Sequence, residues 1–429
     1  MALKKRQFLK IIGIVALVGV AGFAWSHLSH AQVTIRMMSQ SHFVPGFNEE
    51  LVRQANEWAR RRGVKVEIDY IPRQQLPAKL AVEAEAKTGH DIILLWHFET
   101  ALRKENLAVL DDICADLEVK YGSWSDAARY LNYIDGHWRG LAWQSQSGIA
   151  NINVDHWREI GMEPDQVANL DWQSLLEAAK KLHKIGHPVA LAITEDLDSY
   201  MNVFPVFWDY GSIWIDSDGS VKINSPETEF CLSYFKELFQ YMPQEMIGWD
   251  GGGNNKELLS GRGSWTVNPP SIWASAKIKG LPIAEKLTHV SLPSGPEGRY
   301  RNTDVMNLGI WSFSPNIDLA KDLLRFLLEK EQVMKQIGAS WGYNEYHLAA
   351  YRIYPVHPIF EQEPALKYYQ PAIETIVPAG WPAPPSPETT IAYNLRIVPM
   401  MVVKAVTGTD TVTGAIEWAE KQLKRIYGR

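Results

Sequence analysis

Apolar and polar residues repeat with two different periods in the first quarter of the chain. Val33–Ser39 and Val64–Ile71 alternate residue by residue, which predicts strands. Asn48–Gly63 and Leu76–Gly89 repeat their apolar positions every three or four residues and end in glycine, which predicts helices. Asp91–Phe98 holds a continuous apolar run, typical of a buried parallel strand. This order predicts two β–α–β units and therefore a doubly wound α/β sheet.

The rest of the chain continues as a mixture of short strands and amphipathic helices. The predicted strands are Gly148–Asn153, 187–194 (HPVALAIT), and 264–274, which breaks at Pro269 and Pro270. The predicted helices are 169–186 with Asp171 as its cap, 226–242, 255–261 closed by Gly261, and 318–338 as one continuous helix. The Pro-rich stretch 379–390 predicts a loop, with two helical stretches after it.

The first 31 residues have the features of an export signal. Four basic residues up to Lys10 precede an apolar run that ends near Trp25. This run is shorter than the roughly 20 residues that span a bilayer, and Ser29 and Ala31 supply small residues for cleavage near Ala31. We therefore expect a removed signal peptide, residues 1–31, and a periplasmic mature protein. KKRQFLK resembles a twin-arginine leader, but Lys5 replaces the first arginine, so both export routes stay open.

The charge of the expected mature chain argues against a polyanionic partner. Four of the 43 Lys and Arg residues lie in the leader, which leaves 39 against 49 Asp and Glu and a formal net charge of −10 over residues 32–429. A nucleic-acid partner is not expected. Cys114 and Cys231 are the only cysteines. They form one disulfide or stay as two buried thiols, and the sequence leaves both open.

The chain has 17 tryptophans, and several lie outside apolar runs. Core packing explains more than half of them. Six stand beside Gly, Asn, Pro, Gln or His, as residues of loops do: Trp96, Trp143, Trp249, Trp265, Trp341 and Trp381. Aromatic rings at such positions suit a site for a ligand that has flat apolar faces and hydroxyl edges.

Two glycine clusters in Trp249–Pro270 suggest a phosphate-binding loop, but neither cluster matches a known phosphate-binding motif. A Walker loop needs Lys-Ser or Lys-Thr after its last glycine, and neither cluster has it. Gly261 and Gly263 lack the third glycine of a dinucleotide fingerprint and follow a predicted helix instead of a strand. Turn formation is the remaining explanation, so we expect no nucleotide cofactor.

The remaining catalytic and metal motifs are also missing from the sequence. The twelve histidines have no HExxH or CxxC frame, so no metal is expected, and no GxSxG elbow is present. Paired carboxylates come from distant parts of a chain and leave no local motif. A secreted glycoside hydrolase therefore stays as the enzyme alternative.

The order of the segments resembles extracellular solute-binding proteins of carbohydrate-type ABC importers, the group that includes maltose-binding protein. GHDIILLW resembles the family's strand at the cleft, with His90 in place of its usual proline. GLAWQSQSGIANINVDHWREIG resembles its crossover strand and following helix, with Asn153 at the usual asparagine and Ile152 in place of the usual tyrosine. LLSGRGSWTVNPPS and LPSGPEGRYRN follow in the family's order. The resemblance covers nearly the whole mature chain.

The resemblance implies two doubly wound α/β lobes, joined by hinge strands, that close on a ligand without making or breaking bonds. The implied lobes are 32–143 plus 290–340 and 144–289 plus 341–429. The implied ligand-binding residues are Gln40, Ser41, His42, Trp96, His97, Trp143, Gln144, Gln146, Trp208, Asp209, Trp249, Asn255, Trp265, Asn268, Thr303, Asp304, Trp341, Tyr343 and Trp381, with Asn302 and Tyr393 as further candidates.

The chemistry of these residues favours a carbohydrate or polyol ligand. Tryptophan rings cover sugar faces, and Asp, Asn, Gln and His bond hydroxyl groups. The predicted loops are poor in Lys and Arg, with Arg299 and Arg301 the nearest cations, so a neutral polyhydroxy solute is favoured over glycerol phosphate or a polyamine. The implied partners are this small molecule and the membrane permease of an ABC importer, and we expect a monomer.

Overall fold

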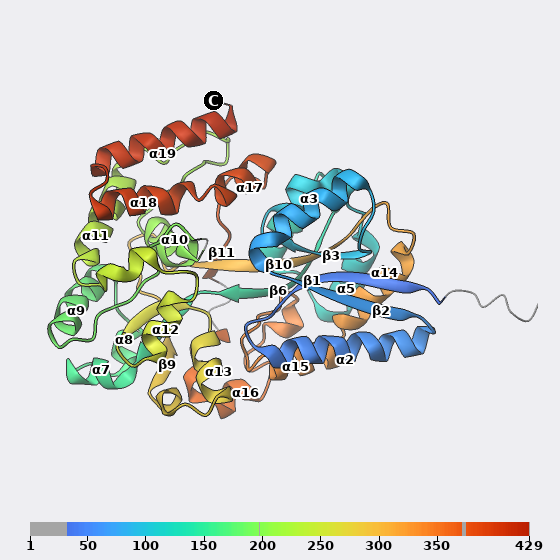
Figure 1. The fold of residues 1–429 in the computed structure, drawn as a ribbon, viewed down its shortest axis with the longest axis horizontal. Coiled ribbons are helices and arrows are strands. Elements are labelled where there is room, and N and C mark those ends of the chain that lie inside the picture. The colour runs from blue at the N-terminus through green and yellow to red at the C-terminus, as the bar shows by residue number, and fades with distance from the viewer. Residues whose placement is uncertain (1–31, 197, 371–374, 429) are drawn as a thin grey trace, which may run out of the picture.

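A computed structural model describes residues 32–196, 198–370 and 375–428, and these form two α/β lobes side by side (Figure 1). The sheet of lobe one contains β1 (Thr34–Gln40), β2 (Lys65–Ile71), β3 (Ile92–Trp96), β6 (Leu141–Ser147) and β10 (Arg301–Ile310). β1 is parallel to both β2 and β3, whereas β10 is antiparallel to both β3 and β6. The predicted β–α–β units are therefore confirmed, and an antiparallel pair from distant parts of the chain extends them.

Helices cover the sheet of lobe one on both faces. They are α2 (Pro45–Arg62), α3 (Leu76–Ala86), α4 (Glu99–Arg103), α5 (Asp111–Tyr121), α6 (Asp126–Asn132), α14 (Ile317–Leu327) and α15 (Lys330–Ala339), with a small hairpin of β4 (Tyr133–Ile134) and β5 (His137–Trp138). α2 ends where predicted, because Gly63 adopts the left-handed conformation (φ 69°) and its N–H bonds the carbonyl of Ala59. All five residues of β3 are buried, as its continuous apolar run predicts.

Lobe two has a short antiparallel sheet with β7 (Ile149–Asn153) between β8 (Trp265–Asn268) and β9 (Leu287–Val290). The helices around it are α7 (Val154–Glu159), α8 (Pro164–Val167), α9 (Trp172–Lys184), α10 (Ser199–Asp209), α11 (Pro226–Phe239), α12 (Gly253–Leu259), α13 (Ser271–Ile278), α16 (Ile359–Gln362), α17 (Pro387–Asn394), α18 (Ile397–Thr407) and α19 (Val412–Tyr427). The predicted cap of α9 is confirmed, since the Asp171 carboxylate accepts the N–H of Ser174 at 2.7 Å.

The chain passes between the lobes on long strands. β6 belongs to the sheet of lobe one and continues into β7 of lobe two, with only Gly148 between them. β10 runs back into lobe one, and its first two residues pair in parallel with β11 (Ile376–Val377). Figure 1 shows β6, β10 and β11 lying between the two lobes. These strands form the connection about which the lobes can move.

Three predicted elements differ from the structure. Residues 187–194 form no strand: Val189 makes one bridge to Trp265, and the N–H groups of Ala192 and Thr194 then bond the side chains of Asn202 and Ser199 instead of a neighbouring strand. The predicted helix 318–338 is two helices, because Glu329 adopts an extended conformation (ψ 141°) between α14 and α15.

The third difference is in the C-terminal part. α17 begins inside the predicted Pro-rich loop, because the Ser386 hydroxyl caps it by accepting the N–H of Thr389 and Pro387 fits its first turn. Arg396 then takes the left-handed conformation (φ 56°) and separates α17 from α18. Three helices therefore end the described chain where two were predicted.

Several sequence expectations concern features beyond the fold itself. Cys114 on α5 and Cys231 on α11 are both buried free thiols, and burial raises the pKa of each thiol. The predicted signal peptide, residues 1–31, lies outside the described residues. Within residues 32–196, 198–370 and 375–428, no helix is both long and apolar enough to cross a membrane. The lobe boundaries at 143, 289 and 340 stay predictions.

Candidate ligand-binding site

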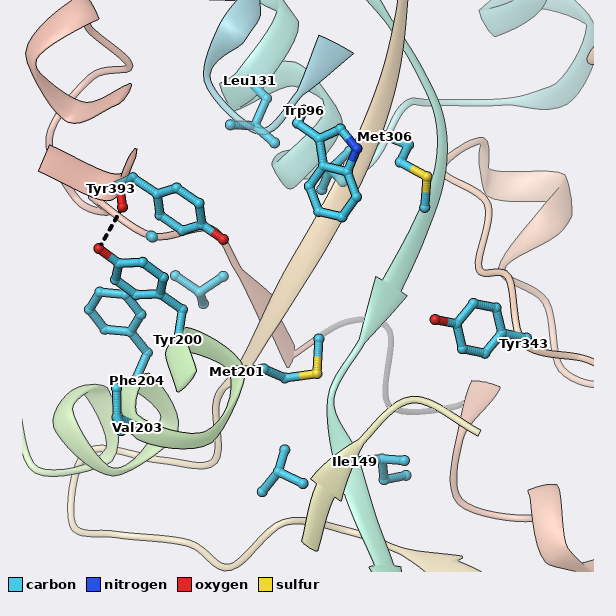
Figure 2. Packing of buried hydrophobic residues seen from close by; sticks show 14 of the residues in the cluster. Trp96, Leu131, Ile149, Tyr200, Met201, Val203, Phe204, Met306, Tyr343 and Tyr393 are labelled. Carbon is cyan, nitrogen blue, oxygen red and sulfur yellow. Dashed lines mark hydrogen bonds between the residues drawn. The ribbon is translucent and has the colours of Figure 1, made fainter. Parts of the chain in front are cut away.

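The ends of β1, β3, β6 and β10 meet where the two lobes face each other, which is where open α/β sheets bind ligands. The indole N–H of Trp96 donates to the side-chain oxygen of Gln40 at 3.1 Å. The side-chain amides of Gln40 and Gln144 both donate to the sulfur of Met306, at 3.0 and 3.6 Å. Figure 2 shows Trp96 and Met306 on one side of this region and Met201 of α10 on the other. The site therefore has an apolar surface with amide groups around it.

A second group of side chains closes one side of the same region. The ring of His42 bonds the side-chain oxygen of Asn344 at 3.0 Å, and the Tyr343 hydroxyl donates to Gln146 at 2.9 Å. Burial lowers the pKa of His42 to about 4, so its imidazole is neutral at physiological pH. A neutral imidazole and three polar side chains can exchange hydrogen bonds with hydroxyl groups without binding an ion.

Some buried amide atoms on or beside these strands have no hydrogen-bond partner among the residues that the structure describes. They are the oxygen of Gln144, both polar atoms of Asn302 and the nitrogen of Asn344. All three side chains are at most 1% exposed. Gln144, Met306 and Asn302 share one face, because residues two apart on a strand point the same way and Met306 lies opposite Gln144 in the sheet. Most buried polar groups in proteins are paired, so these atoms indicate a place for a polar ligand.

α17 of lobe two contacts lobe one at the end of β3. The Tyr393 hydroxyl and the His97 ring are 2.9 Å apart, and the Thr390 hydroxyl donates to the carbonyl of Phe98. A small pocket with a cavity volume of about 30 Å³ lies here. It is lined by Arg73, Pro77, Trp96, His97, Phe98, Glu99, Thr390, Tyr393 and Asn394. Residues of both lobes thus form this pocket, as in a cleft that closes on a ligand.

Three of the tryptophans in the predicted site have packing partners in the cores of the lobes. Trp143 is 1% exposed and donates to Gln336 of α15, on the opposite face of β6 from Gln144. Trp208 stacks on Phe204 with centroids 4.8 Å apart, and Trp265 meets the edge of Trp172. These contacts account for the three indoles by packing, and their role in binding stays a prediction.

The carboxylate of Asp209 is enclosed by two hydrogen bonds. It accepts the indole N–H of Trp172 and the backbone N–H of Tyr300, both at 2.7 Å. Burial raises its pKa to about 7. Two further tryptophans of the predicted site are partly exposed: Trp341 meets the edge of Trp273, and Trp381 lies 38% exposed against Tyr300.

The remaining predicted residues lie in strands, in loops and on one helix around the sheets. Asn268 of β8 donates to Ser271, and Thr303 of β10 accepts from Ser147. Trp249 is half-buried in the glycine-rich loop, against Gly253. The structure also places Ser41 exposed beyond β1, Asn255 on α12 with a buried oxygen that has no partner, and the backbone of Asp304 opposite Gln146.

Sequence reasoning missed four residues that lie at this site: Arg73, Met201, Met306 and Asn344. The guanidinium of Arg73 lies 3.9 Å from the centre of the Trp96 ring. The side chain of Met201 lies where a Cβ on Gly148 would be. Arg73 could have been found, because it lies two residues after the end of β2, at the same sheet edge as Gln40 and Trp96. Nothing in the sequence distinguishes the two methionines from ordinary core residues.

The described residues contain no group of three or more His, Cys, Asp or Glu side chains that could hold a metal ion. Two α/β lobes joined by hinge strands, with polar and aromatic side chains where they meet, define the class of periplasmic binding proteins. The chain belongs to the bacterial extracellular solute-binding protein family, whose model matches residues 45–334. Family and fold are therefore those of binding proteins.

Individual relatives are distant in sequence. A probable ABC transporter-binding protein of Deinococcus radiodurans is 23% identical over 357 residues, 79% of this chain and 80% of that protein. The maltose-bound MalE3 of T. maritima has a TM-score of 0.78 at 22% identity, over 92% of this chain and 100% of that chain. A solute-binding protein of Thermotoga lettingae bound with α-D-tagatose has a TM-score of 0.77 at 18% identity, over 92% and 100%. The predicted fold is confirmed.

Proposed function

We propose that this protein is the exported substrate-binding component of an ABC importer and that it captures a sugar or sugar-like polyhydroxy solute between its lobes. The family is extracellular, which supports export by the predicted leader and delivery to a membrane permease. The relative from Deinococcus radiodurans carries an ABC transporter-binding name, and two of the structural neighbours hold maltose and tagatose. The protein acts as a monomer with lobes 32–143 plus 290–340 and 144–289 plus 341–429.

The observation that carries the proposal is the set of unpaired amide atoms on Gln144, Asn302 and Asn344. Gln144 lies opposite Met306 in the sheet, and Met306 in turn lies opposite Trp96. A buried polar atom without a partner costs about 1–3 kcal/mol. A ligand with several hydroxyl groups removes this penalty, because each hydroxyl both donates and accepts. An apolar ligand would leave the amides unpaired.

The ligand-contacting residues that we propose come from both lobes and from the hinge strands. They are Gln40, His42, Trp96, His97, Gln144, Gln146, Asn302, Tyr343, Asn344 and Tyr393, with Met201 and Met306 as apolar contacts. The ligand stabilises the closed arrangement more than the open one, and the closed form is what the permease recognises. No bond-making step is involved.

The first test is a thermal-shift screen of residues 32–429 against sugars, polyols and polyamines, followed by calorimetric titration of every hit. A ligand that binds the native state alone raises the melting temperature. The matched pair of variants is Gln144→Leu and Gln332→Leu. Both glutamines are buried with an unpaired oxygen, but Gln332 lies on α15, and its backbone carbonyl contacts Gln54 of α2.

The Gln144 variant is expected to bind the ligand about tenfold more weakly, because it loses one hydrogen bond to a polar ligand. The Gln332 variant should keep the wild-type affinity. Absence of any saccharide or polyol binding would refute the proposed ligand class. Equal affinities of the two variants would remove Gln144 from the binding residues.

A further inference from the structure

Next to the pocket at Trp96, a larger groove has an arginine on each side. Its cavity volume is about 280 Å³. Its lining is Arg73, Gln74 and Pro77 from lobe one and Asp196, Asn394 and Arg396 from lobe two. Arg73, Pro77 and Asn394 also line the pocket at Trp96, so the two spaces share a wall. In Figure 1, α3 and α17, the helices that carry Pro77 and Asn394, face each other across the lobes.

The guanidinium of Arg73 has a fixed position in this wall. It stacks over Trp96 with its central carbon 3.9 Å from the ring centre, within the range of a cation–π contact. Trp96 covers one face of the guanidinium, whereas the N–H groups point outward in the plane of the guanidinium, away from the ring. Trp96 in turn is held by its hydrogen bond to Gln40. Such an arginine is suited to bind a planar carboxylate with two parallel hydrogen bonds.

Arg396 reaches the groove from the other lobe. It stands between α17 and α18 in the left-handed conformation (φ 56°), which is unfavourable for a residue with a side chain. It is exposed, and none of the described carboxylates forms an ion pair with it. Arg73 and Arg396 are more than 300 residues apart in sequence, so the fold alone brings them to one groove.

The charges of the lining favour a ligand group with one negative charge. The lining has two arginines and one carboxylate, Asp196. One oxygen of Asp196 accepts the backbone N–H of Asp198. Asp198 itself is 9% exposed and is outside the lining. A net charge of +1 matches a carboxylate better than a phosphate ester, which carries nearly two charges at neutral pH.

We propose that the ligand is an acidic sugar, and that its carboxylate binds between Arg73 and Arg396 while its ring lies against the amides and apolar side chains near Trp96. The inference rests on the proposed function and narrows it from polyhydroxy solutes to those with a carboxylate. It also reverses the expectation of a neutral ligand, which was based on predicted loops that are poor in Lys and Arg and have Arg299 and Arg301 as the nearest cations. The charged side chains that matter follow β2 and α17 instead.

The test compares each sugar acid with its own uncharged form. Residues 32–429 are titrated by calorimetry with mono- and disaccharide uronates of the gluco, galacto and manno series, their methyl esters, the parent neutral sugars and the sugar 6-phosphates. The variants are Arg73→Gln, Arg396→Gln and, as the matched control, Arg60→Gln, an exposed arginine on α2. Far-ultraviolet circular dichroism and melting temperature verify the folding of each variant.

One or more uronates should bind about tenfold or more tightly than the methyl ester, since a hydrogen bond to a charged group is the stronger kind. Each of the two groove variants should lose about tenfold for the uronate and keep the affinity for neutral sugars. Raising the salt concentration should reduce the preference, because the groove is open to solvent. The Arg60 variant should match the wild type.

The outcomes of these titrations distinguish a failure of the acidic-sugar inference from a failure of the proposed function. Neutral sugars that bind as tightly as uronates overturn the inference and leave the proposed function standing. Preference for the sugar phosphates overturns the carboxylate assignment. Binding of simple carboxylates such as citrate, without any saccharide, overturns the proposed function and keeps the arginine site. An equal loss of affinity for charged and neutral sugars in the groove variants also overturns the inference.

Discussion

A buried ion pair holds the junction of the two lobes, and breaking it should destabilise the protein strongly. Arg301 of β10 and Glu345 are 3.1 Å apart, and each side chain is 1% exposed. Arg301 also donates to the carbonyls of Ser147 and Gly148, at 3.3 and 2.8 Å, where β6 passes into β7. The other oxygen of Glu345 accepts from the backbone N–H of Ser147. The pair therefore connects β10, the crossover and the segment around Glu345.

The magnitude follows from what each single substitution leaves behind. In Glu345→Leu, the Arg301 charge stays buried without its partner, and in Arg301→Met the Glu345 charge does. Each change should lower the free energy of unfolding by about 3–5 kcal/mol. This is a large part of the 5–15 kcal/mol of a typical native protein. The double variant leaves no charge, so its loss should be smaller than the sum of the single losses by about 2 kcal/mol or more.

The assay is urea denaturation of residues 32–429, followed by tryptophan fluorescence and circular dichroism. Coincidence of the two transitions is required before a single free energy is derived. Single variants whose free energy of unfolding falls by less than about 1 kcal/mol would contradict the reasoning, because burying a charge without its partner costs more than that. Additive losses in the double variant would also contradict it, since they would mean that the two side chains act separately.

Three further predictions concern the crossover, a buried histidine and two tryptophans. Gly148→Ala should cost about 1–3 kcal/mol of stability, because the new Cβ would lie 2.4 Å from the Cγ of Met201; an unchanged urea midpoint would contradict this. Burial lowers the pKa of His289 to about 4, so the native state loses stability as the pH falls from about 6.5 to 4, by up to about 3 kcal/mol. In His289→Phe this part of the pH dependence should disappear from the melting temperature, and an identical profile would show that other groups dominate. Trp96→Ala should weaken ligand binding in calorimetry, whereas Trp143→Phe should lower the melting temperature without changing the affinity. The reverse result would place Trp143 in the binding site and Trp96 in the core.

Local patterns determined most of lobe one. Strict alternation at Val64–Ile71 and the apolar run at Ile92–Trp96 predicted β2 and β3. A strand that is buried on one face alternates apolar and polar residues, and a strand that is buried on both faces is apolar throughout. The cap at Asp171 and the stop at Gly63 are also local, since a side chain or a left-handed backbone satisfies groups within the same turn. The family resemblance came from the order of such segments.

Patterns were insufficient where the partner of a segment lies far along the chain. Residues 187–194 have the composition of a strand, but the side chains of Ser199 and Asn202 take the hydrogen bonds that a neighbouring strand would have supplied. At Glu329 the helical period continues across the break, and contacts with Lys120 and Tyr121 of α5 replace helical continuity. In both places tertiary contacts override local preference.

The sequence alone thus determined the fold class, the family and the kinds of residue available for a site. The tertiary structure decided which of them meet. Trp96 and Trp143 look alike in sequence, but Trp96 contacts Gln40 and Arg73, whereas Trp143 points to α15. Arg73 and Arg396 line one groove although they lie more than 300 residues apart. The physical reason is that periodicity reports whether a residue is buried, whereas a binding site depends on which distant residues share that burial.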